Sequence, residues 1–367
     1  MVLYFFGADK PWHELSSIGF NRRNTNLLKS FVENDQVKKV YVIHRTIKTK
    51  FFKKVLSTNN TKKVKDVFFA SLFPETPFTE ILNYWIIRIQ LLLQTFHFND
   101  KEDLLFCYLI KGFQDLKVSG IKGRIIFDTD HNLIDNLYLS SEQRISTGKF
   151  LVNIASKVDW YISSSRSMIE WLNHRGIFNT YRIRNAVDWK RFENIKVHKS
   201  HDNIPIIGYC GTLSKWIDWD FLCQLLIMRP QWCFTFIGSP YNDDSYKKLL
   251  SFPNVKLLGK KSSYSIPHIL NSFDIGLVLY KNMQGLDVDS MKIFEYLAAG
   301  VPVISTRYHN YLKEDFNDLL NLADSPEDVI KKAEEILTYR EESASIKDFL
   351  SKHTWNQRVE EIIKLVE

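Results

Sequence analysis

Cysteine is scarce in this chain, and the few cysteines form no recognisable framework. The 367 residues contain four, Cys107, Cys210, Cys223 and Cys233, with no CxxC pair and no histidine spacing of the zinc-finger kind. A disulfide-stabilised scaffold of this length would need more, so we expect reduced thiols in a cytoplasmic setting. The sequence starts without a basic leader, an apolar core and a small-residue cleavage site, and we therefore expect no signal peptide.

Two glycine-rich phosphate motifs are also missing. The chain contains no GxGxxG and no GxxxxGK[ST], which excludes a dinucleotide-binding fingerprint and a P-loop. One small-residue loop remains at residues 208–215, directly after a predicted strand. Its glycines would let the backbone approach a phosphate, and Lys215 would add positive charge. A tight turn with no ligand explains the same residues.

The remaining composition is globular, with 45% hydrophobic and 25% charged residues. A chain of this length predicts two domains rather than one. The net charge of +7 is unevenly divided: residues 1–200 hold 31 Lys and Arg against 19 Asp and Glu, whereas residues 201–367 hold 18 against 23. A basic first half indicates an anionic partner, such as nucleic acid, phosphorylated lipid or a membrane, or else a solvated lysine-rich surface.

Short apolar runs alternate with amphipathic stretches along the whole chain. The predicted strands of the first half are 1–6, 40–44, 104–109, 124–127 and 160–163, with helices at 24–34, 79–96 and 137–157. The alternation resumes after Asp202 with apolar segments at 205–210, 221–228, 234–238, 255–258, 275–280 and 301–305 and a helix at 290–299. Such alternation predicts βαβ units, here in two doubly wound α/β domains joined near residues 188–203. Ligands of such sheets bind beyond the carboxyl ends of the strands.

The segment 285–306 has the strongest chemical pattern. Asp287 and Glu295 are separated by seven residues, and a helix that begins at Ser290 places Lys292 and Glu295 on one face. With Ser290 as N-cap, the first turn offers backbone N–H groups and an ammonium to a phosphate, and carboxylates to sugar or ribose hydroxyls. The alternative is a surface ion pair between Lys292 and Glu295 that needs no ligand.

This segment resembles the donor-binding signature of GT-B glycosyltransferases of the group 1 kind. In that family an acidic residue, seven others and a glutamate precede a small-residue helix end and a Pro-Val strand. Lys292 and the run EYLAAGVPV are most similar to the branch that builds bacterial surface polysaccharides of the teichuronic-acid and xanthan type. Further blocks follow in the family's order: 184–188 with Phe192, Trp216 with Asp218, Pro230, 254–276, and 353–355.

The resemblance implies a GT-B fold, with two Rossmann-like domains that face each other across a cleft. Residues 1–190 would bind the acceptor, residues 204–350 the nucleotide sugar, and a C-terminal helix at 351–367 would pack back on the first domain. The implied function is metal-independent transfer of a sugar, from a donor that is UDP-linked, to a lipid-linked or growing glycan in bacterial surface polysaccharide synthesis. No cofactor, metal or nucleic acid is implied. The location would be cytoplasmic, with a peripheral place on the inner face of the cell membrane left open.

Two other function classes remain open from the sequence. A sugar-nucleotide epimerase or hydrolase of the same fold would need no polymer acceptor, and a non-catalytic subunit would bind donor or membrane in support of an active partner. The resemblance assigns the donor site to Gly211, Thr212, Lys215, Tyr264, Ile266, Ser290, Met291, Lys292 and Glu295. The acceptor-side residues would be Trp12, His13, Arg22 and Arg23, although the two arginines are also compatible with ordinary surface charge.

The candidate catalytic residues are Asp130, Asp128, His131 and Asp287. The first three follow the predicted strand 124–127, where we expect them at the edge of the cleft. An inverting transferase needs a base for the acceptor hydroxyl proton, and Asp130 is the first candidate, before Asp128 and His131. A retaining transferase needs no such base, and an aspartate here would also cap a helix at 132–136.

Two further stretches bear on membrane contact. The predicted helix 79–96 is apolar around most of its circumference, with a narrow stripe formed by Glu80, Asn83, Gln90 and Gln94. It is too short and polar to span a bilayer, and a helix of the core is its ordinary interpretation. Upstream, lysines alternate with phenylalanines, which is typical of docking on anionic lipid or of solvated surface. These residues are Lys48, Lys50, Phe51, Phe52, Lys53, Lys54, Lys62, Lys63, Lys65, Phe68 and Phe69.

Overall fold

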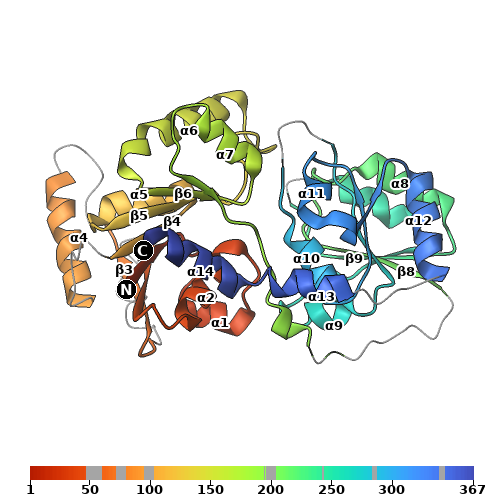
Figure 1. Cartoon of the computed structure of the whole chain (residues 1–367), viewed down its shortest axis with the longest axis horizontal. Coiled ribbons are helices and arrows are strands. Elements are labelled where there is room, and N and C mark those ends of the chain that lie inside the picture. The colour runs from red at the N-terminus through yellow and green to blue at the C-terminus, as the bar shows by residue number, and fades with distance from the viewer. Residues whose placement is uncertain are drawn as a thin grey trace. The chain divides into compact units, whose positions relative to one another are not determined.

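The computed structural model divides the chain into two compact units. It describes residues 1–46, 60–71, 80–94, 103–193, 195, 204–241, 244–282, 287–338 and 344–367 (Figure 1). Unit 1 contains Met1–Ile134, Ser140–Arg184 and Trp355–Glu367, and unit 2 contains Asp135–Leu139 and Asn185–Thr354.

Unit 1 is built on a seven-stranded parallel sheet of order β3-β2-β1-β4-β5-β6-β7. Its central strands are apolar on both faces because helices cover both, as expected of a parallel sheet. The strands are β1 (Val2–Phe6), β2 (Lys39–Arg45), β3 (Val64–Phe69), β4 (Leu104–Tyr108), β5 (Arg124–Asp128), β6 (Trp160–Ser163) and β7 (Thr180–Arg182). The helices are α1 (Trp12–Ile18), α2 (Arg23–Glu33), α4 (Glu80–Gln94), α5 (Leu109–Ser119), α6 (Ser141–Asn153), α7 (Arg166–Asn173) and α14 (Trp355–Val366).

Unit 2 repeats the same winding with six parallel strands of order β10-β9-β8-β11-β12-β13. The strands are β8 (Ile206–Cys210), β9 (Cys233–Ile237), β10 (Val255–Leu257), β11 (Ile275–Val278), β12 (Val303–Thr306) and β13 (Leu320–Ala323). The helices are α8 (Trp219–Met228), α9 (Ile266–Leu270), α10 (Met291–Ala298), α11 (Leu312–Phe316), α12 (Pro326–Thr338) and α13 (Ala344–Ser351). In both sheets the strand order reverses once, between β1 and β4 and between β8 and β11.

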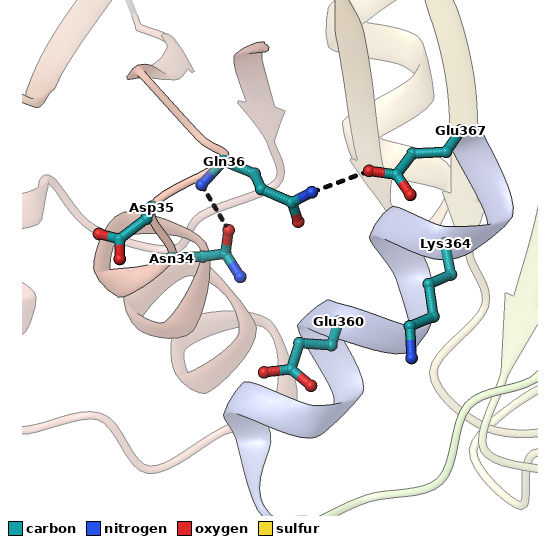
Figure 2. Close-up of a pocket in the computed structure, with 6 residues that line it drawn as sticks. All are labelled: Asn34, Asp35, Gln36, Glu360, Lys364 and Glu367. Carbon is teal, nitrogen blue, oxygen red and sulfur yellow. Dashed lines mark hydrogen bonds between the residues drawn. The ribbon is translucent and has the colours of Figure 1, made fainter.

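The last helix, α14, lies in unit 1 although its sequence follows the second sheet. It packs against α2, and Arg124, the first residue of β5, donates to the carbonyl of Val366. At the end of the chain, Gln36 Nε2 donates to Glu367 Oε1 at 2.8 Å (Figure 2). The chain therefore closes unit 1 with its last residues.

One predicted helix begins later than the sequence suggested. The stretch 137–157 becomes α6 and a short 3₁₀ turn at Ala155–Lys157, because Ser140 forms a capping box with Gln143. The Ser140 hydroxyl accepts from the Gln143 N–H, and the Gln143 side chain accepts from the Ser140 N–H. This pair stops the helix from extending toward residue 137.

The membrane interpretation of the Lys/Phe stretch is wrong for its last residues. Phe68 and Phe69 lie in β3, the edge strand of the first sheet, and are 2% and 0% exposed. Lys63 Nζ donates to the carbonyl of Asn34 at 2.6 Å, a contact within the fold. The earlier residues Lys48, Lys50, Phe51, Phe52, Lys53 and Lys54 lie outside the described residues.

Candidate functional site

The polar residues of unit 2 gather where its strand order reverses. β8 and β11 are neighbours, but the chain continues from them toward opposite edges of the sheet. In open parallel sheets this is the point where ligands bind, beyond the carboxyl ends of the strands. The loop that starts with Gly211 follows β8, and Tyr280 follows β11 closely. Of the donor residues predicted from the sequence, Gly211 and Thr212 follow β8, and Ser290, Met291, Lys292 and Glu295 lie at the N-cap of α10 or within it.

Two glycines let the chain fold tightly at this point. Gly238, which follows β9, has a φ of +144°, and a Cβ there would lie 1.9 Å from the carbonyl oxygen of Gly211. Gly211 has a φ of +149°, and its Cβ would lie 2.9 Å from Cε and 3.0 Å from Nζ of Lys292. Only glycine allows both approaches. The backbone of the loop after β8 thereby contacts the lysine of α10.

Lys292 is held by two tyrosines, of which Tyr209 lies in β8 and Tyr280 follows β11. Its ammonium donates to the hydroxyl of Tyr209 at 3.3 Å and to the hydroxyl of Tyr280. Nζ also lies 4.6 Å from the centroid of each ring. Burial alone would lower the pKa of Lys292, but the two phenol oxygens outweigh it and raise the pKa. The side chain is therefore a fixed cation at neutral pH.

The alternative of a surface ion pair between Lys292 and Glu295 is wrong. Among the described residues the ammonium contacts phenol oxygens and forms no ion pair with that carboxylate within 4 Å. Burial raises the pKa of Glu295, while Arg191 and Lys292 oppose the rise. The positive charges of Arg191 and Lys292 thus both act on the partly buried carboxylate of Glu295 in α10.

The start of α10 is a buried turn. Ser290 occupies the N-cap position, as predicted, but its side chain makes no capping hydrogen bond. Its neighbour Asp289 accepts the N–H of Asn185 at 2.7 Å, and the carbonyl of Asp289 accepts from the Asn185 side chain at 2.6 Å. Asp287 and Ser290 are 4% and 5% exposed. The segment that joins the two units in sequence therefore fixes the N-terminus of α10.

Lys215, another predicted donor residue, contacts residues 137 and 138 of unit 2. Its ammonium donates to the carbonyl of Leu137 and lies 4.1 Å from the ring centroid of Tyr138. The carbonyl of Thr212 accepts from the Tyr209 hydroxyl at 2.9 Å, which ties the Gly211 loop to the lysine cluster. Tyr264 is 56% exposed. Ile266 begins α9 and packs on the core of unit 2, and Met291 begins α10.

Unit 1 has its own cluster at the reversal between β1 and β4. Gly7, after β1, has a φ of +95°, and its Cβ would lie 2.6 Å from the carbonyl oxygen of Tyr108 at the end of β4. Asn24, in the first turn of α2, donates to the carbonyl of Gly7 at 3.1 Å. These contacts bring the start of α2 against the carboxyl ends of β1 and β4.

Arg23 and Asp128 form the buried centre of this cluster. Arg23 Nε donates to Asp128 Oδ2 at 2.9 Å, and the two side chains are 1% and 0% exposed. The second oxygen of Asp128 accepts the N–H of Asp130 at 2.8 Å. Burial raises the pKa of Asp128, and Arg23 opposes that rise. Arg23 is thus not a surface charge. Both oxygens of Asp128 already accept hydrogen bonds, one from Arg23 and one from the N–H of Asp130.

Asp130 is placed by a strained backbone. Its φ is +62°, and Leu109, which follows β4, has a φ of +58°. Left-handed backbone costs free energy for residues other than glycine and gathers at functional sites. Asp130 Oδ2 accepts from the Tyr108 hydroxyl at 2.8 Å and lies 3.2 Å from Nδ1 of His131. Residues 132–136 form no helix, so the capping interpretation of these aspartates is wrong.

The Asp130 and His131 side chains shift each other's protonation. Burial would raise the pKa of Asp130, but the hydrogen bond from His131 and the nearby charges lower it. Burial would lower the pKa of His131, but the bond to Asp130 raises it. Together they form a carboxylate–imidazole pair in which Nδ1 faces the carboxylate.

The predicted acceptor-side residues contact different carboxylates: Trp12 and His13 lie near Asp66, and Arg23 pairs with Asp128. Asp66, buried in β3, accepts the backbone N–H of Trp12 at 3.0 and 3.1 Å and lies 3.0 Å from His44 Nε2. Nδ1 of His13 is 3.9 Å from the same carboxylate. Arg22 is exposed and pairs with Asp9 at 2.6 Å. Of the two arginines, therefore, Arg23 is the one that pairs with the candidate catalytic residues Asp128 and Asp130.

Sequence reasoning missed the aromatic and basic partners of both clusters. Tyr209, Tyr280 and Tyr108 have no motif of their own, and they matter because strands that are separated in sequence pair in the sheets and end side by side. Arg191 sits one residue before Phe192 in the segment that resembles the family, which was the only signal for it. Its guanidinium donates to the carbonyl of Ser263.

A pocket in unit 1 lies between the end of α2 and the last helix, α14. It has a volume of about 320 Å³ and is lined by Asn34, Asp35, Gln36, Glu360, Lys364 and Glu367 (Figure 2). Gln36 precedes β2, and its carbonyl accepts from the N-terminal amine of Met1. The pocket is therefore at the amino ends of the strands, away from the candidate catalytic aspartates.

Comparison with known proteins supports the family resemblance. Residues 218–364 match the model of the family described as glycosyl transferase-like. TuaH of Bacillus subtilis (strain 168), named as a candidate teichuronic acid biosynthesis glycosyltransferase, is 26% identical over 201 residues. These cover 50% of this chain and 50% of TuaH, so the chain spans about half the length of this curated relative. The predicted similarity to group 1 glycosyltransferases of bacterial surface polysaccharide synthesis is confirmed.

Solved structures show the same fold along the whole chain. Anabaena HepE, in complex with UDP and glucose, is 15% identical with a TM-score of 0.61 and covers 99% of both chains. The lipopolysaccharide outer core galactosyltransferase WaaB is 14% identical with a TM-score of 0.58, over 100% of this chain and 98% of that one. A trehalose-6-phosphate phosphatase N-terminal domain from Candida albicans has a TM-score of 0.64. The predicted GT-B fold is confirmed, and the last match shows that the fold alone does not identify a reaction.

Proposed function

We propose that this protein is a glycosyltransferase of bacterial surface polysaccharide synthesis. It moves a sugar from a nucleotide sugar, which is UDP-linked, to a lipid-linked or growing glycan. The observation that carries the proposal is Lys292, a half-buried cation at the start of α10, held against Gly211 at the strand reversal of unit 2. The family match of residues 218–364 and the name of TuaH support the same reaction class.

The donor diphosphate would bind Lys292 and the N-terminus of α10. Both are positive before the substrate arrives, so negative charge that develops on the leaving diphosphate is stabilised with little reorganisation. A fixed ammonium and a helix dipole supply the charge that a divalent cation provides elsewhere, and we therefore propose a metal-independent reaction without a cofactor. Glu295 would accept hydroxyls of the ribose, and Asp287 would contact the sugar.

The proton acceptor of an inverting reaction is better assigned to the Asp130–His131 pair than to either residue alone. Asp130 already accepts from Tyr108 and His131, which stabilise the carboxylate and make it a weaker base. With Nδ1 turned to Asp130, His131 offers Nε2 to the acceptor hydroxyl, and the carboxylate stabilises the imidazolium that forms. Asp128 keeps a positioning role, because it holds Arg23 and the N–H of Asp130.

Calorimetry with UDP tests the donor assignment. Lys292→Met should weaken UDP binding about ten- to a hundredfold, because a hydrogen bond to a charged group is worth about 1.5–3 kcal/mol. Lys256→Met, at an exposed lysine of β10, is the control and should bind UDP as the wild type does. Equal affinity of wild type and Lys292→Met, with both chains folded by circular dichroism, would refute the assignment.

Product analysis tests the reaction itself. With a UDP-sugar and no acceptor, an epimerase or hydrolase converts the donor, whereas a transferase leaves it largely intact until acceptor is added. A non-catalytic subunit binds the donor and converts nothing under either condition. NMR of the new glycosidic bond then shows whether the configuration is inverted. Retention would remove the need for the Asp130–His131 base.

A further inference from the structure

Helix α4 packs on unit 1 with its polar stripe and the apolar side chains of Ile87 and Leu91 inward. Figure 1 shows it beside β3 and α5, at the edge of the sheet. Asn83 and Gln90 are 5% and 9% exposed, whereas Trp85 is 61% exposed. The outward side chains, which we name the α4 face, are 41% to 79% exposed: Ile81, Leu82, Tyr84, Trp85, Ile89, Leu92 and Leu93. The expectation that this helix belongs to the core is therefore wrong for most of its apolar residues.

Hydrogen bonds to an open strand explain the orientation. β3 is the edge strand of the sheet, and no other strand of the described residues pairs with its outer backbone groups. Gln94 accepts from the N–H of Phe68 at 2.9 Å and donates to its carbonyl at 2.7 Å. Gln90 makes the same pair with Ala70 at 2.9 and 3.2 Å. Each side-chain amide replaces one residue of a missing strand and covers the edge.

These bonds commit the helix to exposing its apolar side. Turning the α4 face inward would break four hydrogen bonds and leave the buried backbone groups of Phe68 and Ala70 without partners, which is unfavourable. A contiguous patch of seven large apolar side chains is rare on a protein that works alone in water and marks a surface that binds something.

We propose that the α4 face docks on the surface of an anionic phospholipid membrane. No helix of the described residues has the length and apolar character to cross a bilayer. Because α4 has 15 residues, it is about 22 Å long and lies at the interface rather than across it. From Ile81 to Gln94 the helix contains no acidic residue and one arginine. Leucine, isoleucine and tryptophan on one side of a helix suit the headgroup–acyl boundary.

The charges beside the α4 face favour lipid over a second copy of the chain. Arg88 donates to the carbonyl of Gly120 at 3.3 Å, and a Cβ on Gly120 would lie 2.8 Å from the Tyr84 ring. Exposed Lys117 and Lys122 lie on either side of Gly120 in sequence, so the rim of the face is cationic. Two copies placed face to face would bring these rims together, whereas anionic headgroups neutralise them.

Vesicle sedimentation of the full chain tests the docking surface without any sugar substrate, so its outcome is independent of the proposed enzyme activity. The wild type should pellet with phosphatidylcholine vesicles that contain phosphatidylglycerol, and less with phosphatidylcholine alone. Trp85→Ser should lower the partition coefficient about ten- to a hundredfold, as expected from the loss of one buried apolar side chain. Phe178→Ser removes an aromatic side chain that is 76% exposed elsewhere in unit 1 and should leave it unchanged.

The charge of the rim is tested in the same assay. Lys117→Glu with Lys122→Glu should weaken binding to the anionic vesicles and leave binding to phosphatidylcholine unchanged. The circular dichroism spectrum and the cooperative thermal unfolding of every one of these variants should match those of the wild type, which verifies that they are folded. Absence of pelleting by the wild type, or an equal loss in Phe178→Ser, would overturn the proposal. So would a dimer in analytical ultracentrifugation that Trp85→Ser dissociates, because the face would then bind a second copy.

Discussion

Arg22 and Arg23 are adjacent in sequence but should differ sharply in their effect on stability. Arg23 is 1% exposed and pairs with Asp128, which is 0% exposed, whereas Arg22 is 67% exposed and pairs with a half-exposed Asp9. Arg23→Met leaves the buried Asp128 carboxylate with the N–H of Asp130 as its remaining hydrogen-bond donor among the described residues. Removing one partner of a buried ion pair costs about 3–5 kcal/mol, whereas an exposed pair contributes about 0–1 kcal/mol.

The expected magnitude is large enough for thermal unfolding to decide. A loss of 1 kcal/mol lowers the Tm by about 2–4 °C in a domain of this size, so Arg23→Met should lower the Tm of unit 1 by about 6–20 °C. Arg22→Met should change it by less than about 4 °C. The double variant Arg23→Met with Asp128→Leu should regain much of the lost stability, because no unpaired charge remains buried.

The pH dependence gives the same prediction a second readout. In Arg23→Met the carboxyl of Asp128 keeps the pKa rise caused by burial and loses the opposing charge. Its folded pKa then lies above the unfolded value, so the variant should recover stability as the pH falls through that folded pKa. Equal Tm changes for Arg22→Met and Arg23→Met at neutral pH would refute the assignment of a buried ion pair.

Two further predictions concern the two clusters separately. Asp130 raises the pKa of His131, so kcat/KM of an inverting reaction should rise with pH through a value above the ordinary imidazole pKa. Asp130→Asn should move this rising limb of the pH–rate profile to lower pH and reduce turnover about 10²–10⁴-fold. A limb that stays at the same pH in the variant would argue against the pair. Gly211→Ala should weaken UDP binding in calorimetry, because the added Cβ displaces Lys292. Gly176, with a φ of +77° and open space around it, is the control, and Gly176→Ala should lower the stability without changing UDP affinity. Equal UDP affinities of the two variants would contradict the close contact between Gly211 and Lys292.

The strand and helix pattern of the chain could be predicted because parallel sheets leave a local signal. A strand that is covered on both faces is a short apolar run, as in β1 and β4, and the helices between such runs are amphipathic. β3 escaped prediction because lysines flank it and Lys65 and Asp66 interrupt it. Asp66 is nevertheless buried, since Trp12 and His44 satisfy its carboxylate.

The donor helix could also be predicted, because its residues lie within one segment. Asp287, Ser290, Lys292 and Glu295 are close in sequence, so spacing and resemblance place them together. The phenol oxygens that hold Lys292 were not predictable in this way. Tyr209 is 83 residues away from Lys292 and reaches it only because β8 and β11 pair in the sheet.

Sequence by itself determined the alternation of strands and helices, the basic first half and the spacing of the donor segment, because each depends on neighbours along the chain. Tertiary structure alone decided that Arg23 is buried with Asp128, 105 residues away, and that α4 turns its glutamines to β3. Both outcomes depend on which polar groups find partners when water is excluded, and burial makes an unpaired charge or an uncovered strand edge costly. An arginine that follows an arginine, and an apolar helix with a polar stripe, look the same in sequence whichever side finally meets the solvent.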